Sequence, residues 1–187
     1  ERLSGCHGAG NALLLEPARE RGRAGVGAQQ NRDVGIADLA RLAKERTGLA
    51  LLESVRFTEI GRHPLEDRVL NLVEQVNQTF TILVSLAAVE WLFAHHPSAA
   101  PFTLNPGTKS GSDILGQQES LAAEVFAAVR PGNNRKLNRD IKKVAGARAA
   151  RRFVFYYCPD HWCEPYDAPS GTTVRVVPLT RAAVLGE

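Results

Sequence analysis

The sequence predicts an α/β fold in which a mixed central β-sheet is flanked by helices. Three observations carry this prediction: a long apolar stripe at helical spacing, several short apolar runs typical of strands, and a further helix between two of those runs. Helical and strand periodicities that follow one another along a chain are typical of mixed layer folds. The 187 residues, 44% hydrophobic and 23% charged, suit one globular domain.

Two segments show helical periodicity in the first half of the chain. Apolar residues recur at helical spacing over 36–46, and Gly48 provides a stop. Residues 49–55 fit either a strand or a continued helix. The longest apolar stripe follows Pro64 and predicts one helix over 64–95. The sequence therefore places a long helix ahead of the predicted strands.

Neither a membrane span nor a secretory signal is expected. The most apolar stretch, 80–94, is interrupted by polar residues and is shorter than the roughly 20 residues that cross a bilayer, so it favours a buried core helix. The start of the chain lacks a basic segment followed by an apolar run. The three cysteines are too few and too unevenly spaced for a disulfide framework. These features indicate a cytoplasmic protein with reduced thiols and no membrane partner.

The second half of the chain contains the predicted strands. A short strand is expected at 113–115, and the almost wholly apolar run 121–129 predicts the next one. A helix is expected over 133–145, where asparagines can cap its start and a glycine follows its end. Two further strands are expected at 153–157 and 172–177. This order gives the mixed sheet with helices on its faces.

The expected domain organisation is simple. Residues 1–32 are rich in Gly, Ala and Arg without steady periodicity, which is typical of a peripheral or poorly ordered extension. Residues 33–180 are expected to form a single α/β domain. Residues 181–187 are interpreted as a short tail.

Basic residues are concentrated in one block of the sequence. Residues 130–152 carry nine Lys and Arg side chains and one acid, Asp140, so the block is +8 in a chain of net charge +3. Such a block on an otherwise acidic chain is the electrostatic pattern of a nucleic-acid binder. A solvated helix face is the alternative interpretation of the same block.

Two carboxylates fall opposite each other in the predicted hairpin. If residues 117–120 form its loop, Asp113 faces Glu124, and directly opposed residues of an antiparallel pair point to the same sheet face. Like charges at such positions are destabilising unless something compensates them, and a shared divalent cation would do so. The alternative is a slipped register, with Glu124 on an exposed face and Asp113 at the end of a loop.

The two short motifs that contain these acids resemble those of the PD-(D/E)XK nuclease superfamily. They are Ser-Asp-Ile at 112–114 and Ala-Glu-Val-Phe at 123–126. The core of that family has an acidic residue at the start of one strand, an acid-x-Lys triplet on the next, and then a helix and a strand. The resemblance covers 64–157 and implies a restriction-endonuclease-like core in the order α-β-β-α-β.

The chain departs from the family pattern at the lysine. That position holds Phe126, which carries no charge. Some members of the superfamily supply the cation from the following helix, and the resemblance then implies Lys136, with Arg135 second and Lys109 third. A glutamate of the preceding helix near the metal is also common in the family. Glu74 fits that position best, and a solvent-facing helix carboxylate is its alternative.

The resemblance implies a nuclease that hydrolyses phosphodiester bonds of DNA with Mg²⁺ or Mn²⁺ bound by Asp113 and Glu124. A second hypothesis is a catalytically inactive nucleic-acid-binding protein of the same fold. A third is a protein-interaction subunit of a defence complex that docks through residues 1–48; a homodimer is also compatible with the sequence. The residues expected to bind the nucleic-acid backbone are Lys109, Arg135, Arg139, Lys142 and Lys143.

Overall fold

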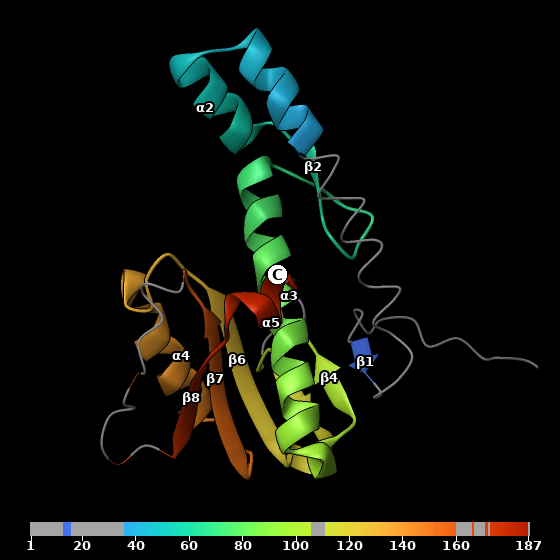
Figure 1. Cartoon of the computed structure of the whole chain (residues 1–187), viewed down its shortest axis with the longest axis vertical. Helices are drawn as coiled ribbons and strands as arrows, with labels where there is room; N and C mark the ends of the chain where they lie inside the picture. The colour runs from blue at the N-terminus through green and yellow to red at the C-terminus, as the bar shows by residue number, and fades with distance from the viewer. Residues whose placement is uncertain are drawn as a thin grey trace, which may run out of the picture.

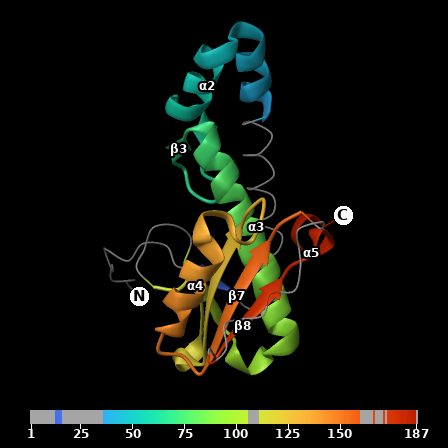
Figure 2. The same cartoon turned by 90° about the vertical axis from the view of Figure 1, so that its left-hand side faces the viewer.

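The fold is a six-stranded mixed sheet with a helix on each face (Figures 1 and 2). The strand order is β1-β4-β5-β6-β7-β8. The pairings from β1 to β6 are antiparallel, and those of β6 with β7 and of β7 with β8 are parallel. The strands are β1 (Leu13–Leu15), β4 (Phe102–Leu104), β5 (Ile114–Gly116), β6 (Leu121–Ala127), β7 (Arg151–Tyr157) and β8 (Val174–Pro178). The computed structural model describes residues 13–15 (backbone only), 36–105, 111–159, 166, 171 and 173–186.

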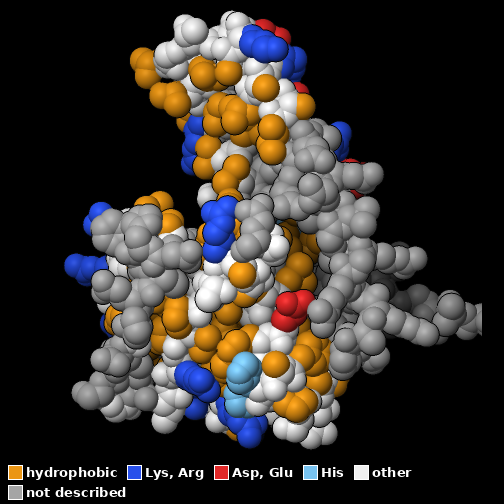
Figure 3. Space-filling model, in the orientation of Figure 1, with side chains coloured by type: hydrophobic (Ala, Val, Ile, Leu, Met, Phe, Trp, Pro, Cys, Tyr) orange, Lys and Arg blue, Asp and Glu red, His pale blue; other side chains and the backbone are white. Residues whose placement is uncertain are grey.

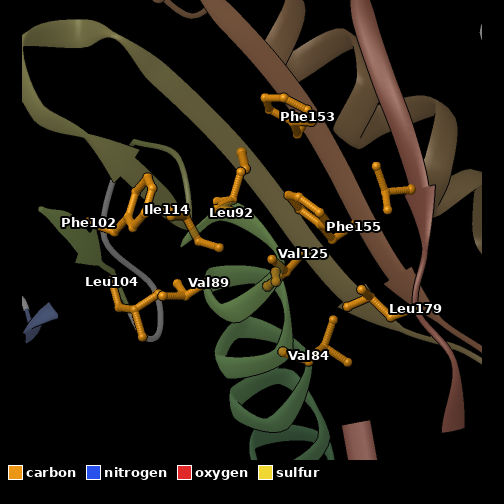
Figure 4. Close-up of a cluster of buried hydrophobic side chains, with 14 of the residues drawn as sticks. Val84, Val89, Leu92, Phe102, Leu104, Ile114, Val125, Phe153, Phe155 and Leu179 are labelled. Carbon is orange, nitrogen blue, oxygen red and sulfur yellow. The ribbon is translucent and has the colours of Figure 1, made fainter. Parts of the chain in front are cut away.

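The predicted mixed α/β sheet flanked by helices is confirmed. The long helix α3 (Leu72–His95) and the short helix α5 (Arg181–Leu185) lie on one face, and α4 (Lys136–Ala145) lies on the other. Strand residues alternate between the faces, so that Ala123 and Val125 pack toward α3 while Ala122 and Phe126 pack toward α4. Figure 4 shows the α3 side of this core, where Leu92 meets aromatic side chains of two strands.

Two further helices project beyond the sheet (Figure 1). Residues 36–45 are helical, and α2 (Gly48–Phe57) follows directly, which settles the ambiguous segment 49–55 as helix. This helical projection displays large apolar side chains; Leu49 is 84% exposed and Phe57 is 75% exposed. Figure 3 shows hydrophobic side chains gathered over the same part of the molecule.

The predicted helix over 64–95 is wrong at its start. Residues 61–70 form a small hairpin of β2 (Gly61–Arg62) and β3 (Val69–Leu70), and α3 begins at Leu72. The reason is local: the Asn71 side chain accepts a hydrogen bond from the Glu74 backbone amide at 2.9 Å and thereby caps the helix. The predicted end is correct, because α3 stops at His95.

The remaining elements lie close to their predicted positions. The strands expected at 121–129, 153–157 and 172–177 are β6, β7 and β8, and their ends differ from the expected ones by at most two residues. The helix expected over 133–145 is the 3-10 turn Asn133–Arg135 followed by α4. The sequence predicted no strand at β4, and it indicated neither β1 within the extension nor α5 within the short tail.

By length and composition, α3 is the one helix among the described residues that could cross a membrane. Its packing shows what its apolar side chains do in this fold. Val84, Val89 and Leu92 are buried against the sheet, in the cluster that also contains Val125 and Phe155. This agrees with the buried core helix that the sequence favoured.

Candidate active site

The predicted register of the acidic hairpin is confirmed. Ile114 pairs with Ala123 and Leu115 with Ala122, so Asp113 lies opposite Glu124 on the neighbouring antiparallel strand. The Asp113 Oδ2 atom accepts a hydrogen bond of 2.8 Å from the backbone amide of Val125. This bond ties the residue just before β5 to β6. Glu124 therefore lies on the face of the sheet that α4 covers, where it meets Lys143, and the charge of Asp113 lies close enough to act on it.

Glu124 is an ionisable side chain in the interior of the fold, with only 1% of its surface exposed. Its Oε2 atom accepts a hydrogen bond from Lys143 Nζ at 2.6 Å, while its buried Oε1 atom has no hydrogen-bond partner among the described residues. Burial raises the pKa of Glu124, the hydrogen bond from Lys143 opposes that rise, and the charge of Asp113 adds to it. Glu124 therefore presents, beside a second acid, one buried oxygen that no residue in the described part of the chain satisfies.

Two lysines of α4 face this part of the sheet, and each has an acidic partner. Lys136 Nζ lies 2.6 Å from both carboxylate oxygens of Asp140 and 5.6 Å from the centre of the Phe126 ring. Burial acts to lower the pKa of Lys143, but its hydrogen bond to Glu124 and nearby acidic charges outweigh burial, so the pKa is raised. Lys136, Asp140 and Lys143 are spaced i, i+4 and i+7, which places them on one side of the helix.

This arrangement revises the assignment of the lysines. The expected cation near the acids was Lys136, and Lys143 was expected to bind the nucleic-acid backbone. In the structure Lys143 contacts Glu124, whereas Lys136 is held by Asp140. Asp140 was not among the expected site residues at all. Burial raises the pKa of Asp140, and its hydrogen bond to Lys136 opposes that effect.

A cavity of about 540 Å³ opens beside Asp113. It lies at the carboxyl ends of the parallel strands β6 and β7, the edge at which open α/β sheets commonly bind ligands. Strand ends form its floor, and α3 and α4 each supply part of its wall. The described residues that line it are Asn77, Phe80, Thr81, Asp113, Val125, Phe126, Ala127, Ala128, Val129, Lys136, Tyr157 and Pro159.

Four of the five other predicted site residues lie among the described residues, and all four are exposed. Glu74 is exposed in the first turn of α3 and does not line the cavity; Asn77 and Thr81, farther along the same helix, do. Arg135, Arg139 and Lys142 are exposed at the start and on the outer side of α4. Lys109 lies outside the described residues. The structure therefore brings together Asp113, Glu124 and Lys143, with Lys136 on the cavity wall.

The donor set fits a divalent cation bound by two carboxylates. Among the described residues no group of three or more His, Cys, Asp and Glu side chains gathers at one point, so any protein ligands would be fewer. Mg²⁺ is commonly held by one or two carboxylates, with water and phosphate oxygens completing its shell. The unsatisfied Glu124 Oε1 atom and the adjacent charge of Asp113 both favour a cation there.

Comparisons with protein-family models, with curated proteins and with solved structures find no match to this chain. The candidate site is therefore defined by its residues and their geometry.

Proposed function

We propose that this chain is a metal-dependent nuclease with a restriction-endonuclease-like core that hydrolyses phosphodiester bonds of DNA. The observation that carries the proposal is the Asp113–Glu124 pair, in which a buried glutamate has one oxygen that no described residue hydrogen-bonds, next to a second acid. The order of elements supports it: helix α3, the antiparallel hairpin β5–β6, helix α4 and the parallel strand β7 follow the family order. Strand β4 is an addition to the core expected from the sequence.

Asp113 and Glu124 would hold Mg²⁺ or Mn²⁺. A cation bound there makes a bound water a better nucleophile and offsets negative charge on the phosphate. Lys143 favours the ionised form of Glu124 and orients its carboxylate, since its ammonium lies 2.6 Å from Oε2. Lys143 would thus be the cation beside the two acids, a role for which the sequence favoured Lys136. It would supply the positive charge that Phe126, at the family's lysine position, lacks. Lys136 lines the cavity while it is paired with Asp140, and from there it would contact a phosphate near Asp113.

The exposed cations of α4 would hold the nucleic-acid backbone. Arg135, Arg139 and Lys142 lie on or next to the helix that carries both site lysines, so a strand bound along α4 passes the cavity. Phosphate contacts of this kind position the ligand without reading its sequence. A cytoplasmic location suits such a protein because nucleic acid is accessible there.

The helical projection supports a second candidate function. Its large apolar side chains, Leu49 and Phe57 among them, are exposed, and exposed apolar patches commonly mark protein contacts. An interaction subunit of a larger complex would use this surface. The inactive nucleic-acid-binding alternative depends instead on Phe126 at the family's lysine position.

A cleavage assay tests the proposal. Supercoiled plasmid DNA is incubated with the protein and Mg²⁺, and nicked and linear products are measured over time. We expect Asp113→Asn and Glu124→Gln to lose cleavage, whereas Glu119→Gln, which alters an exposed acid in the loop between β5 and β6, retains it. Mg²⁺-dependent cleavage that survives both site substitutions would contradict the proposal. So would a wild-type protein that binds both plasmid and single-stranded DNA without cutting either in Mg²⁺.

A further inference from the structure

The cavity beside Asp113 has aromatic walls that a phosphate does not need. Phe80 from α3 and Tyr157 from the end of β7 line it, and their rings are parallel within 2°, with centroids 6.4 Å apart. A flat ring stacked on one of them is therefore parallel to both. Phe126 adds a third aromatic side chain to the wall. Stacked aromatic faces of this kind bind nucleobases without regard to sequence.

Polar groups are confined to two sides of the same cavity. Asn77 and Thr81 lie one helical turn apart on α3, and an asparagine amide has the donors and the acceptor that pair with the edge of a base. Asp113 and Lys136 contribute the opposing charges next to the proposed metal site. A mostly apolar cavity with a few convergent polar groups, about 540 Å³ in volume, is typical of a small-molecule site.

We propose that this cavity binds an unpaired nucleobase of the DNA strand, next to the phosphate that the carboxylate pair addresses. The inference deepens the proposed function and rests on it, because it names the substrate class as DNA with at least one unstacked nucleotide. Bases in an intact duplex are stacked and paired, so their faces are not available to Phe80 or Tyr157. Single strands, frayed ends and mismatched positions release a base at the lowest cost.

The test compares two fluorescently labelled 12-nucleotide single strands of equal charge. One carries thymine at every position, and the other carries abasic residues at every position. Binding is measured by fluorescence anisotropy in Ca²⁺ without Mg²⁺, so that cleavage does not interfere. We expect the all-thymine strand to bind about 5-fold to 150-fold more tightly, the range that follows from roughly 1–3 kcal/mol of stacking per base.

Three variants separate base binding from folding. Phe80→Leu keeps an apolar side chain of similar bulk and removes the flat ring, and Asn77→Ala removes the polar group on the helix. Gln78→Ala alters the neighbouring residue, which does not line the described cavity, and is the matched control. We expect the first two variants to reduce the preference for the all-thymine strand while leaving abasic-strand binding unchanged. Circular dichroism and thermal unfolding verify that each variant is folded.

Equal affinity of the wild-type protein for both strands would overturn the inference. So would a preference that folded Phe80→Leu and Asn77→Ala retain in full. Thymidine 5′-monophosphate that binds as tightly as the all-thymine strand would show a site for free nucleotides instead. A cleavage assay in Mg²⁺ on the all-thymine strand separates the two proposals: cleavage without base preference contradicts the cavity inference alone, and base preference without Mg²⁺-dependent cleavage contradicts the nuclease alone.

Discussion

Replacing Lys143 with alanine tests the electrostatics at the centre of the site. The variant removes the cation 2.6 Å from Glu124 Oε2 and leaves a carboxylate that is only 1% exposed. Breaking a buried ion pair from one side is destabilising because the remaining charge stays buried without compensation. Lys142→Ala, at the exposed neighbouring position, is the matched control.

The size of the effect has a ceiling, because Glu124 can take up a proton instead of staying charged. Protonating a glutamate of ordinary pKa 4.5 at pH 7 costs about 3.4 kcal/mol, at about 1.36 kcal/mol per pH unit. The Lys143 side chain is 47% exposed, so solvent screens the pair and the loss should lie well below this ceiling. We expect a decrease of about 1–2 kcal/mol in unfolding free energy at pH 7.

The sign of the pH dependence follows from the raised pKa of Glu124. Without Lys143 that pKa rises further above its unfolded value, so the folded variant retains a proton that the unfolded chain loses. The variant should match the wild-type protein below pH 4.5 and fall behind it as the pH rises to 7. The assay is thermal unfolding without metal at one pH below 4.5 and at pH 7. We expect the unfolding midpoint of the variant to be lower by about 2–8 °C at pH 7. An equal loss at both pH values, or one no larger than that of Lys142→Ala, would refute the reasoning.

Three further outcomes are expected. Asp140→Asn should weaken the ion pair that positions Lys136 and lower the cleavage rate at saturating DNA, while leaving Mn²⁺ affinity unchanged. If the variant also loses Mn²⁺ binding, Asp140 is a metal ligand instead. Reversing Arg139 and Lys142 to Glu should flatten the dependence of log K for DNA on log salt by about 0.9 for each phosphate that the variant no longer neutralises, and an unchanged slope in anisotropy titrations would place DNA elsewhere. Gly116→Ala should lower the free energy of unfolding, measured by urea denaturation, by about 1–3 kcal/mol. The reason is that its added Cβ would lie 2.9 Å from the Ala99 carbonyl oxygen; wild-type stability would show that the hairpin yields there.

Local sequence patterns predicted most of the fold. They failed for a strand that is very short and for a helix start that is fixed by a side-chain cap. The apolar runs 121–129 and 153–157 predicted β6 and β7, and the observed strands, seven residues each, end within two residues of the predicted bounds. Strand β4 has only three residues, between Pro101 and Asn105, too few for an alternating pattern to be visible. The start of α3 was misplaced because Pro64 resembles a first helical residue, whereas the cap at Asn71 depends on its side chain reaching the Glu74 amide.

The carboxylate pair was predictable because hairpin register follows from loop length. Counting back from the loop placed Asp113 opposite Glu124, and the described register agrees. The Lys143–Glu124 contact was not predictable in the same way, since it joins residues 19 positions apart and depends on how α4 crosses β6. The i, i+4, i+7 spacing of Lys136, Asp140 and Lys143 beside the apolar stripe was the signal that could have identified the cluster.

Direct binding of Mn²⁺ is the measurement closest to the central claim that Asp113 and Glu124 form a metal site. Electron paramagnetic resonance of free Mn²⁺, titrated with protein in the absence of DNA, counts bound ions without requiring turnover. We expect saturable binding of about one ion per chain in the wild-type protein and in Glu119→Gln, and its loss in both Asp113→Asn and Glu124→Gln, because one or two carboxylates hold such a cation. No binding by the wild-type protein, or equal binding by the two site variants, would contradict the account.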